Sequence, residues 1–126
     1  MLIYNCRKTK NIKPKQKGKG RKMMKDYLSI NVEQMINDRG NGAMNQFVIH
    51  DGNLLMFQSY SSLIVVVNYD TNEIVFGEDW DYSVTTGKHR NIFFRDYAYI
   101  SDLASKKGIE KALKDGICGK WKIRTA

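Results

Sequence analysis

The sequence is poor in the residues that build most metal sites and many catalytic sites. It contains two cysteines, two histidines and one proline among 126 residues. Cys6 and Cys118 stand near opposite ends of the chain, so they can pair only if the termini meet, and two free thiols in a reducing compartment are the expectation. No histidine or cysteine has the spacing of a metal ligand set, so we expect no metal and no cofactor.

Long apolar segments are also absent. The longest apolar run covers residues 63–67, far short of the roughly 18 residues that cross a bilayer. Residues 1–4 are too few for the apolar region of a signal peptide, and the positive charges follow them instead of preceding them. The sequence therefore predicts a cytoplasmic protein that makes no contact with a membrane.

Positive charge is concentrated at one end of the chain. The net charge is +8, from 21 Lys and Arg against 13 Asp and Glu. Residues 23–126 hold twelve of the bases and all thirteen acids, a net of −1. Residues 1–22, which we call the basic arm, hold no acid and nine bases: Arg7, Lys8, Lys10, Lys13, Lys15, Lys17, Lys19, Arg21 and Lys22. Any affinity for phosphate that scales with counterion release must come mainly from this arm.

Two interpretations of the basic arm remain open. Its composition cannot bury enough apolar surface to offset the entropy of ordering, which predicts a disordered tail that binds nucleic acid without sequence preference. Alternatively, lysine, glycine and arginine have purine-only codons, so the run before Met23 and Met24 can be a translated ribosome-binding sequence. The native start is then Met23 or Met24, and residues 1–22 are an over-extended gene start. Mass spectrometry of the natively expressed N-terminus distinguishes the two.

Residues 23–126 have the composition of one α+β domain. Residues 31–37 predict a short helix, because an asparagine suits the N-cap and apolar residues recur at helical spacing. Residues 46–77 alternate apolar runs with turn residues, which predicts a four-stranded antiparallel β-meander. Its first hairpin carries Asp-Gly at 51–52, the signature of a type I′ turn. Residues 63–67 are apolar throughout, which indicates a central strand covered on both faces.

Two further helices and a terminal segment complete the expected domain. Residues 83–97 predict one long helix on the sheet, with a serine N-cap and an aromatic stripe. Residues 106–115 predict a C-terminal helix that ends at Gly116. Residues 120–124 alternate polar and apolar residues, as an edge strand or a docked tail does. The expected fold class is α+β: a four-stranded antiparallel β-meander packed by one long helix, plus short N- and C-terminal helices.

The densest polar and aromatic segment runs from Trp80 to Arg90. On a helix, Thr85, Lys88 and His89 share one face. The basic residues here add positive charge near a helix N-terminus, which favours anions, so the segment can hold a phosphate or a partner carboxylate. Alternatively, Tyr82 and the threonines merely fix the corner between loop and helix. The residues assigned to partner binding are Trp80, Tyr82, Thr85, Thr86, Lys88, His89 and Arg90.

Two stretches carry a resemblance. FQSYSSLIV at 57–65 and DYSVTTGKH at 81–89 are similar to a family of small uncharacterised proteins encoded by bacteriophages and plasmids. The resemblance covers residues 46–97 and implies an accessory protein of a mobile element acting in a bacterial host cell, with no established activity. The matching residues are Ser59, Tyr60, Tyr82, Ser83, Thr85, Thr86, Lys88 and His89.

Three classes of function follow as hypotheses. The expected function is a non-enzymatic protein that binds and occludes a host protein or ribonucleoprotein, for instance as an anti-CRISPR-like inhibitor. The first alternative is direct binding of nucleic acid through the basic arm. The second is an enzyme such as a nuclease that depends on His89, either alone or paired with Cys118, and the scarcity of ligands disfavours it.

Removing the arm tests the nucleic-acid hypothesis. Each phosphate that the protein neutralises adds about 0.9 to the slope of log affinity against log salt. We therefore expect full-length protein to bind a polynucleotide with a steep salt dependence, and residues 24–126 to lose most of that affinity. Fluorescence anisotropy at several salt concentrations measures both. Tight, salt-sensitive binding by residues 24–126 would show that the affinity for polynucleotide does not come mainly from the basic arm.

Overall fold

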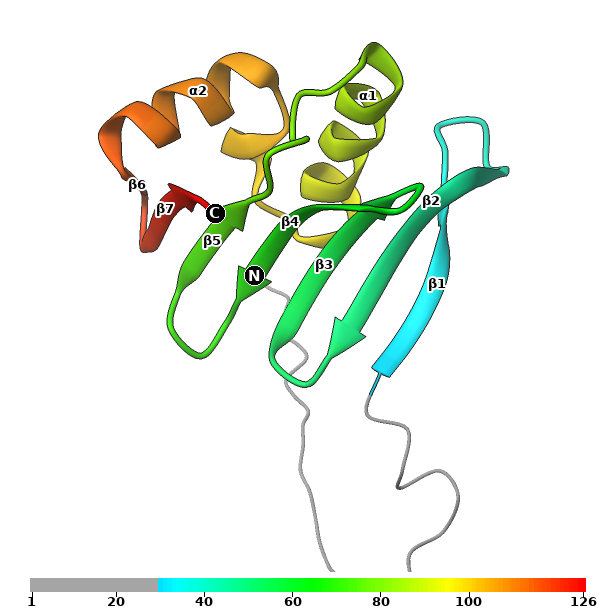
Figure 1. The fold of residues 1–126 in the computed structure, drawn as a ribbon, viewed down its shortest axis with the longest axis horizontal. Coiled ribbons are helices and arrows are strands. Elements are labelled where there is room, and N and C mark those ends of the chain that lie inside the picture. Colours follow the sequence, from blue (N-terminus) through cyan, green and yellow to red (C-terminus); the bar gives the residue numbers. More distant parts are fainter. Residues whose placement is uncertain (1–29) are drawn as a thin grey trace, which may run out of the picture.

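A computed structural model describes residues 30–126, so the basic arm and Cys6 lie outside the described residues. Seven strands form one mixed sheet in the order β1-β2-β3-β4-β5-β7-β6, and the helices lie over one of its faces (Figure 1). The helices are α1, Val84–Ile92, and α2, Lys106–Asp115. The strands are β1 (Ile30–Ile36), β2 (Gly42–Asp51), β3 (Leu54–Ser59), β4 (Ser62–Asn68), β5 (Glu73–Phe76), β6 (Ile117–Cys118) and β7 (Trp121–Thr125).

The connections explain why the sheet is mixed. Strands β1 to β5 are antiparallel neighbours joined by short turns. The chain then passes through both helices before β7 pairs parallel to β5, with Ile74 opposite Ile123. A parallel pair needs such a long crossover, whereas a hairpin does not. Residues 120–124 therefore do not form the outermost strand, because β6 pairs with the outer side of β7.

The expected fold class is wrong. The four meander strands exist as β2 to β5, but they are the middle of a seven-stranded mixed sheet, and no single long helix packs on it. Residues 31–37 form most of β1 instead of a helix, because β2 offers an edge for pairing that overrides the weak local helical pattern. The expected covering helix is also short: α1 has nine residues before a π-helical turn, Phe93–Tyr97.

The first hairpin turns one residue later than expected. Asp51 pairs with Leu54, so Gly52 and Asn53 form a two-residue loop. Gly52 has a φ of 60°, and Asn53 is not among the residues with positive φ. A type I′ turn requires positive φ at both central residues, whereas a type II′ turn requires it only at the first. The Asp-Gly pair therefore marked the hairpin correctly but not the geometry of its turn.

The capping signals located the helix ends correctly. Ser83 accepts a hydrogen bond of 3.1 Å from the backbone N–H of Thr86 at the start of α1. Helix α2 spans the predicted residues, with Ser105 as its N-cap and Gly116 ending it at a φ of 73°. These caps act through short-range hydrogen bonds, whereas the capping signal at Asn31 was overridden by strand pairing with β2.

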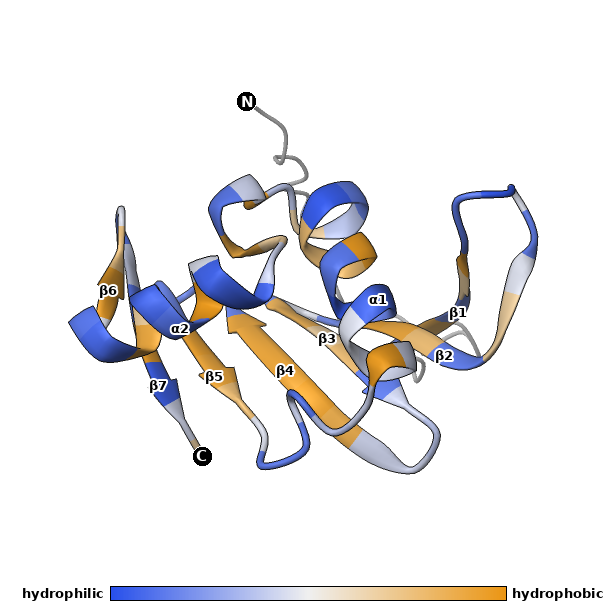
Figure 2. Ribbon diagram, turned by 90° about the horizontal axis from the view of Figure 1, so that it is seen from above, coloured by the Kyte–Doolittle hydropathy of each residue, from blue (hydrophilic) through white to orange (hydrophobic). Residues whose placement is uncertain are grey.

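Aromatic side chains fill the space between the sheet and the helices. Phe93 stacks on Phe57 of β3 with ring centroids 5.8 Å apart, and Phe94 lies 5.8 Å from Phe76 of β5. All four side chains are fully buried. The strands below the helices are accordingly the most apolar part of the ribbon (Figure 2).

The other face of the sheet carries no described helix. Residues 63–67 were expected to be covered on both sides, and that is wrong, because Leu63 is exposed and Val66 is only half-buried. A bulge in the β3–β4 pairing leaves Ile64 without an opposite residue, and Ile64 and Val65 are both buried. The continuous apolar run thus reflects a bulge and an uncovered apolar face, not two covering layers.

Truncating Phe93 tests the aromatic core. Replacing Phe93 with Ala removes the stack on Phe57 and leaves a cavity, so we expect the free energy of unfolding to fall by about 3–5 kcal/mol. Urea denaturation followed by circular dichroism measures the loss. Val84→Ala is the control: this side chain is 91% exposed, and its removal should change stability by less than about 0.5 kcal/mol. Equal unfolding midpoints for the two variants would contradict the packing described.

Candidate functional site

The candidate site is the α1 corner, residues 80–90, where the chain leaves β5 and enters α1. Gly77 makes this exit possible: its N–H donates to the Ile64 carbonyl at 2.8 Å, and a Cβ at this position would collide with the Leu63 carbonyl oxygen. Trp80 then packs its ring edge on Phe76, with centroids 5.8 Å apart. The corner is therefore anchored to the core at its first residue.

A buried arginine organises the corner. The Arg90 residue is only 2% exposed, although its side chain carries a full charge. Its Nη1 donates to the Trp80 carbonyl at 2.9 Å, and its Nε and Nη2 donate to Asn91 Oδ1 at 3.3 and 3.1 Å. The guanidinium also lies over the Trp80 ring, 5.3 Å from its centroid. Burial lowers the pKa of Arg90, and the hydrogen bond and charge of Asp81 oppose that shift.

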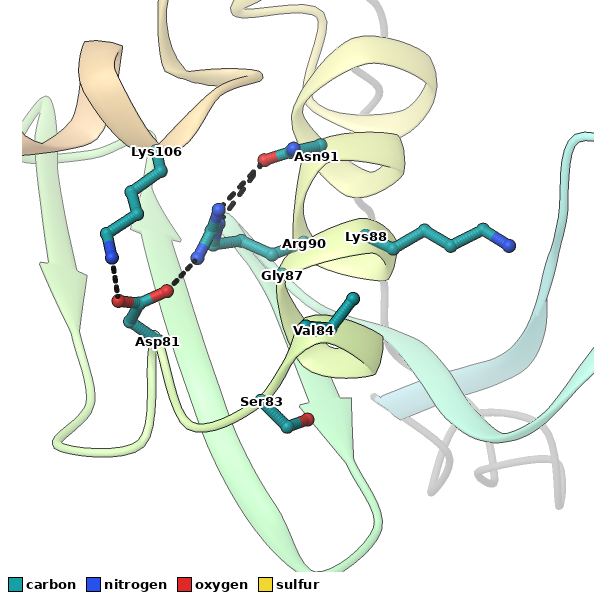
Figure 3. Close-up of a pocket in the computed structure, with 8 residues that line it drawn as sticks. All are labelled: Asp81, Ser83, Val84, Gly87, Lys88, Arg90, Asn91 and Lys106. Carbon is teal, nitrogen blue, oxygen red and sulfur yellow. Dashed lines mark hydrogen bonds and ion pairs between the residues drawn. The ribbon is translucent and has the colours of Figure 1, made fainter.

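Asp81 joins this arginine to the second helix. One carboxylate oxygen lies 3.4 Å from Arg90 Nη1, and the other lies 2.9 Å from Lys106 Nζ at the start of α2 (Figure 3). The hydrogen bond from Lys106 is the largest cause that holds the pKa of Asp81 below its ordinary value of 3.8. A carboxylate of the protein thus occupies the position between these two cations.

Other residues of the corner are exposed to solvent. Tyr82 is 78% exposed and Val84 is 91% exposed. Thr85 and Lys88 are exposed as well, and Figure 3 shows Lys88 extending away from the Asp81–Arg90 pair. These side chains form the outer surface of the corner. The hydroxyl of Thr85, the apolar side chain of Val84 and the positive charge of Lys88 lie within about one turn of α1.

The remaining predicted site residues have structural contacts. His89 is half-buried, and its Nδ1 lies 2.8 Å from the Thr85 carbonyl. Thr86 is buried and its hydroxyl lies 3.2 Å from the Ser83 hydroxyl. The predicted site therefore divides into an outer part that a partner can reach and an inner part that supports it. The inner part consists of Trp80, Thr86, His89 and Arg90.

Sequence reasoning missed the partners that hold Arg90. Asp81, Asn91 and Lys106 line the same shallow depression as Ser83, Gly87 and Lys88 (Figure 3). Lys106 belongs to another helix, and nothing in local spacing connects it to Asp81. Asn91 directly follows Arg90, but neighbouring residues on a helix do not normally face each other, so spacing gave no signal for it either.

The described residues offer few groups for metal binding or thiol chemistry. No cluster of three metal-binding side chains occurs within residues 30–126. Cys118 lies on β6 as a free, half-buried thiol, and burial raises its pKa. In the same range no helix has the length and apolarity needed to cross a membrane.

Comparison with known proteins gives one match. A model of a family of unknown function (DUF8033) matches residues 30–111. The chain belongs to this family. The matched region begins with β1 and ends within α2, so it contains the whole α1 corner and excludes the basic arm. No curated protein and no solved structure matches the chain. The expectation of an uncharacterised family is thereby confirmed.

Neutralising Asp81 tests the network of the α1 corner. Because the folded state lowers the pKa of Asp81, the carboxylate stabilises the fold above the ordinary pKa, and this contribution is lost as the pH falls through the folded pKa. We expect Asp81→Asn to lower the free energy of unfolding by about 1 kcal/mol at pH 7, given its partial exposure. The difference from wild type should shrink below pH 3.8.

Glu78→Gln is the matched control, since Glu78 is an exposed acid of the same loop. Urea denaturation across the acid range measures all three proteins. A pH-independent effect of Asp81→Asn would show that the charge of Asp81 is not what stabilises the corner.

Proposed function

We propose that the protein is a non-enzymatic accessory protein that binds a host protein or ribonucleoprotein through the α1 corner and blocks it by occlusion. The observation that carries the proposal is a contrast within one short segment. Tyr82 and Val84 remain 78% and 91% exposed, while Arg90 beneath them is 2% exposed and held by several hydrogen bonds. Large exposed side chains on a fixed backbone are a common arrangement of a recognition surface.

Conformational entropy and charge both favour binding of a partner at the α1 corner. A partner that covers Tyr82 and Val84 gains apolar contact, and the rigid corner loses little conformational freedom on binding. Tyrosine is enriched at the centres of interfaces because its ring is large and its hydroxyl finds a hydrogen-bond partner. Lys88 adds a positive charge beside them, which favours a partner with acidic groups and speeds its association.

A mobile-element origin is the second part of the proposal. It rests on the resemblance of residues 57–65 and 81–89 to proteins of bacteriophages and plasmids. Accessory proteins of such elements act inside the bacterial cytoplasm on host machinery, including defence complexes, so an anti-CRISPR-like role is the form of occlusion we favour by analogy. A direct nucleic-acid function through the basic arm is the alternative, supported by its nine bases.

A binding experiment with paired variants tests this function. Full-length protein is immobilised, and nuclease-treated bacterial lysate is passed over it. We expect a stable host complex that survives the nuclease and is lost, by at least about tenfold in yield, with Tyr82→Ala combined with Val84→Ser. Met44→Ala is the matched control, because Met44 is also 78% exposed but lies on β2.

The outcomes separate the hypotheses. Loss of the complex on nuclease treatment would favour the nucleic-acid alternative. Equal retention by the double variant and by Met44→Ala would show that the α1 corner is not the contact surface. Unchanged circular dichroism of both variants excludes unfolding as the cause, as expected for side chains this exposed.

A further inference from the structure

The sheet face opposite the helices is apolar over most of its width. Strand register places five side chains in one row across β1 to β5, and all of them are partly or fully exposed. The row consists of Val32, Ile49, Met56, Val66 and Val75. Leu54, Phe47 and Leu63 extend the apolar surface above and below it. We call this surface the open face.

Exposing a face of this composition to water is unfavourable. Antiparallel sheets that expose one side to water normally alternate apolar and polar residues along each strand. Here two of the three outward positions of β3 are Leu54 and Met56, the third being Gln58, and those of β2 include Phe47 and Ile49. Five strands spaced about 4.8 Å apart and three rows of side chains give a face on the order of 400 Å², most of it apolar. That is about half of the roughly 800 Å² that each partner contributes to a stable interface, and the rim of the face adds to it.

Two opposite charges at the rim of the open face lie symmetrically about its central strand. The row next to the apolar row contains Asp51 on β2 and Lys122 on β7. Neither side chain makes an ion pair with any other residue of the described range, whereas Glu73 in the same row is bound to Arg124 at 2.9 Å. Strand β4 lies midway between β2 and β7 in the sheet order. One acid and one base thus lie at equal distances on opposite sides of the central strand.

We propose that a second copy of this chain packs on the open face, related to the first by a two-fold axis that runs along β4. A rotation about this axis brings the two open faces together and places β2 of one copy against β7 of the other. Asp51 of each copy then faces Lys122 of its neighbour, which forms two ion pairs per dimer. Val66 of each copy lies at the axis, and Met56 packs toward Val75 of the other copy.

The geometry agrees with the way sheets pack. Two sheets with the same right-handed twist stack face to face about 10 Å apart, with their strands nearly aligned. The two-fold operation preserves the twist, so the surfaces remain parallel over their width. An isologous contact of this kind closes on itself and makes a dimer, not a fibre. The helices lie on the outer sides, so the dimer exposes two α1 corners.

A charge at the axis tests the apolar contact. We expect full-length protein to sediment as a dimer at micromolar concentrations and Val66→Lys to sediment as a monomer, because two lysines would meet at the axis. Val84→Lys makes the same change on the helix side, where Val84 is 91% exposed, and should leave the dimer intact. Circular dichroism shows whether Val66→Lys remains folded.

A charge exchange tests the partner even if Val66→Lys does not fold. Asp51→Lys and Lys122→Asp should each weaken the dimer at least about fivefold, since two ion pairs are replaced by like-charge contacts. The double variant should restore the affinity, because each pair is re-formed with its signs reversed. Glu110→Lys on α2 carries the same charge change away from the face and should have no effect. Sedimentation equilibrium measures each dissociation constant.

Three results would overturn the proposal. One is a monomer at every concentration, which would leave the open face to residues 1–29 or to a different partner. Another is a dimer that persists in a folded Val66→Lys variant. The third is a double charge variant whose dimer is as weak as those of the single variants. If the partner is a second copy of this chain, that copy carries both substitutions, and the ion pairs must re-form.

Discussion

The buried guanidinium of Arg90 is the interaction on which the arrangement of helices depends. A buried charge is costly unless it is paired and hydrogen-bonded, and here the Trp80 carbonyl, the Asp81 carboxylate and the Asn91 side chain satisfy it. These partners come from the loop after β5 and from α1, and Asp81 extends the connection to α2 through Lys106. One charged group therefore sets the position of the loop and of both helices relative to one another.

This constraint separates the exposed residues of the α1 corner from the buried residues that hold them. Because the inner residues of the α1 corner are held by hydrogen bonds, Tyr82 and Val84 are presented on a backbone that does not need to reorganise. Within residues 30–126, the layer of helices covers only one side of the sheet, and the other side is apolar and uncovered. The described residues thus present two surfaces: the exposed corner, which we propose binds a host partner, and the open face, which we propose binds a second copy of the chain.

The sequence predicted the parts of the fold that local chemistry controls. The N-caps at Ser83 and Ser105 and the end of α2 at Gly116 follow from short-range hydrogen bonds, and the structure has them at those residues. Residues 31–37 show the opposite case, because a weak helical pattern gave way to pairing with β2. Pairing between distant segments has no local signature, so the parallel β5–β7 pair was also missed. For the site, the segment was predicted, but the division into exposed and buried residues was not.

The sequence by itself determined the partition of charge, the start of both helices, the hairpins and the segment that forms the α1 corner. Each of these depends on residue type and on contacts within a few positions along the chain. Only the tertiary structure decided that β1 is a strand, that Arg90 is buried against Asp81 and Lys106, and that one face of the sheet is left open. Those features depend on which distant segments become neighbours. A polar side chain that would be solvated on an exposed loop must be hydrogen-bonded once it is buried, and it then holds the neighbouring segments together.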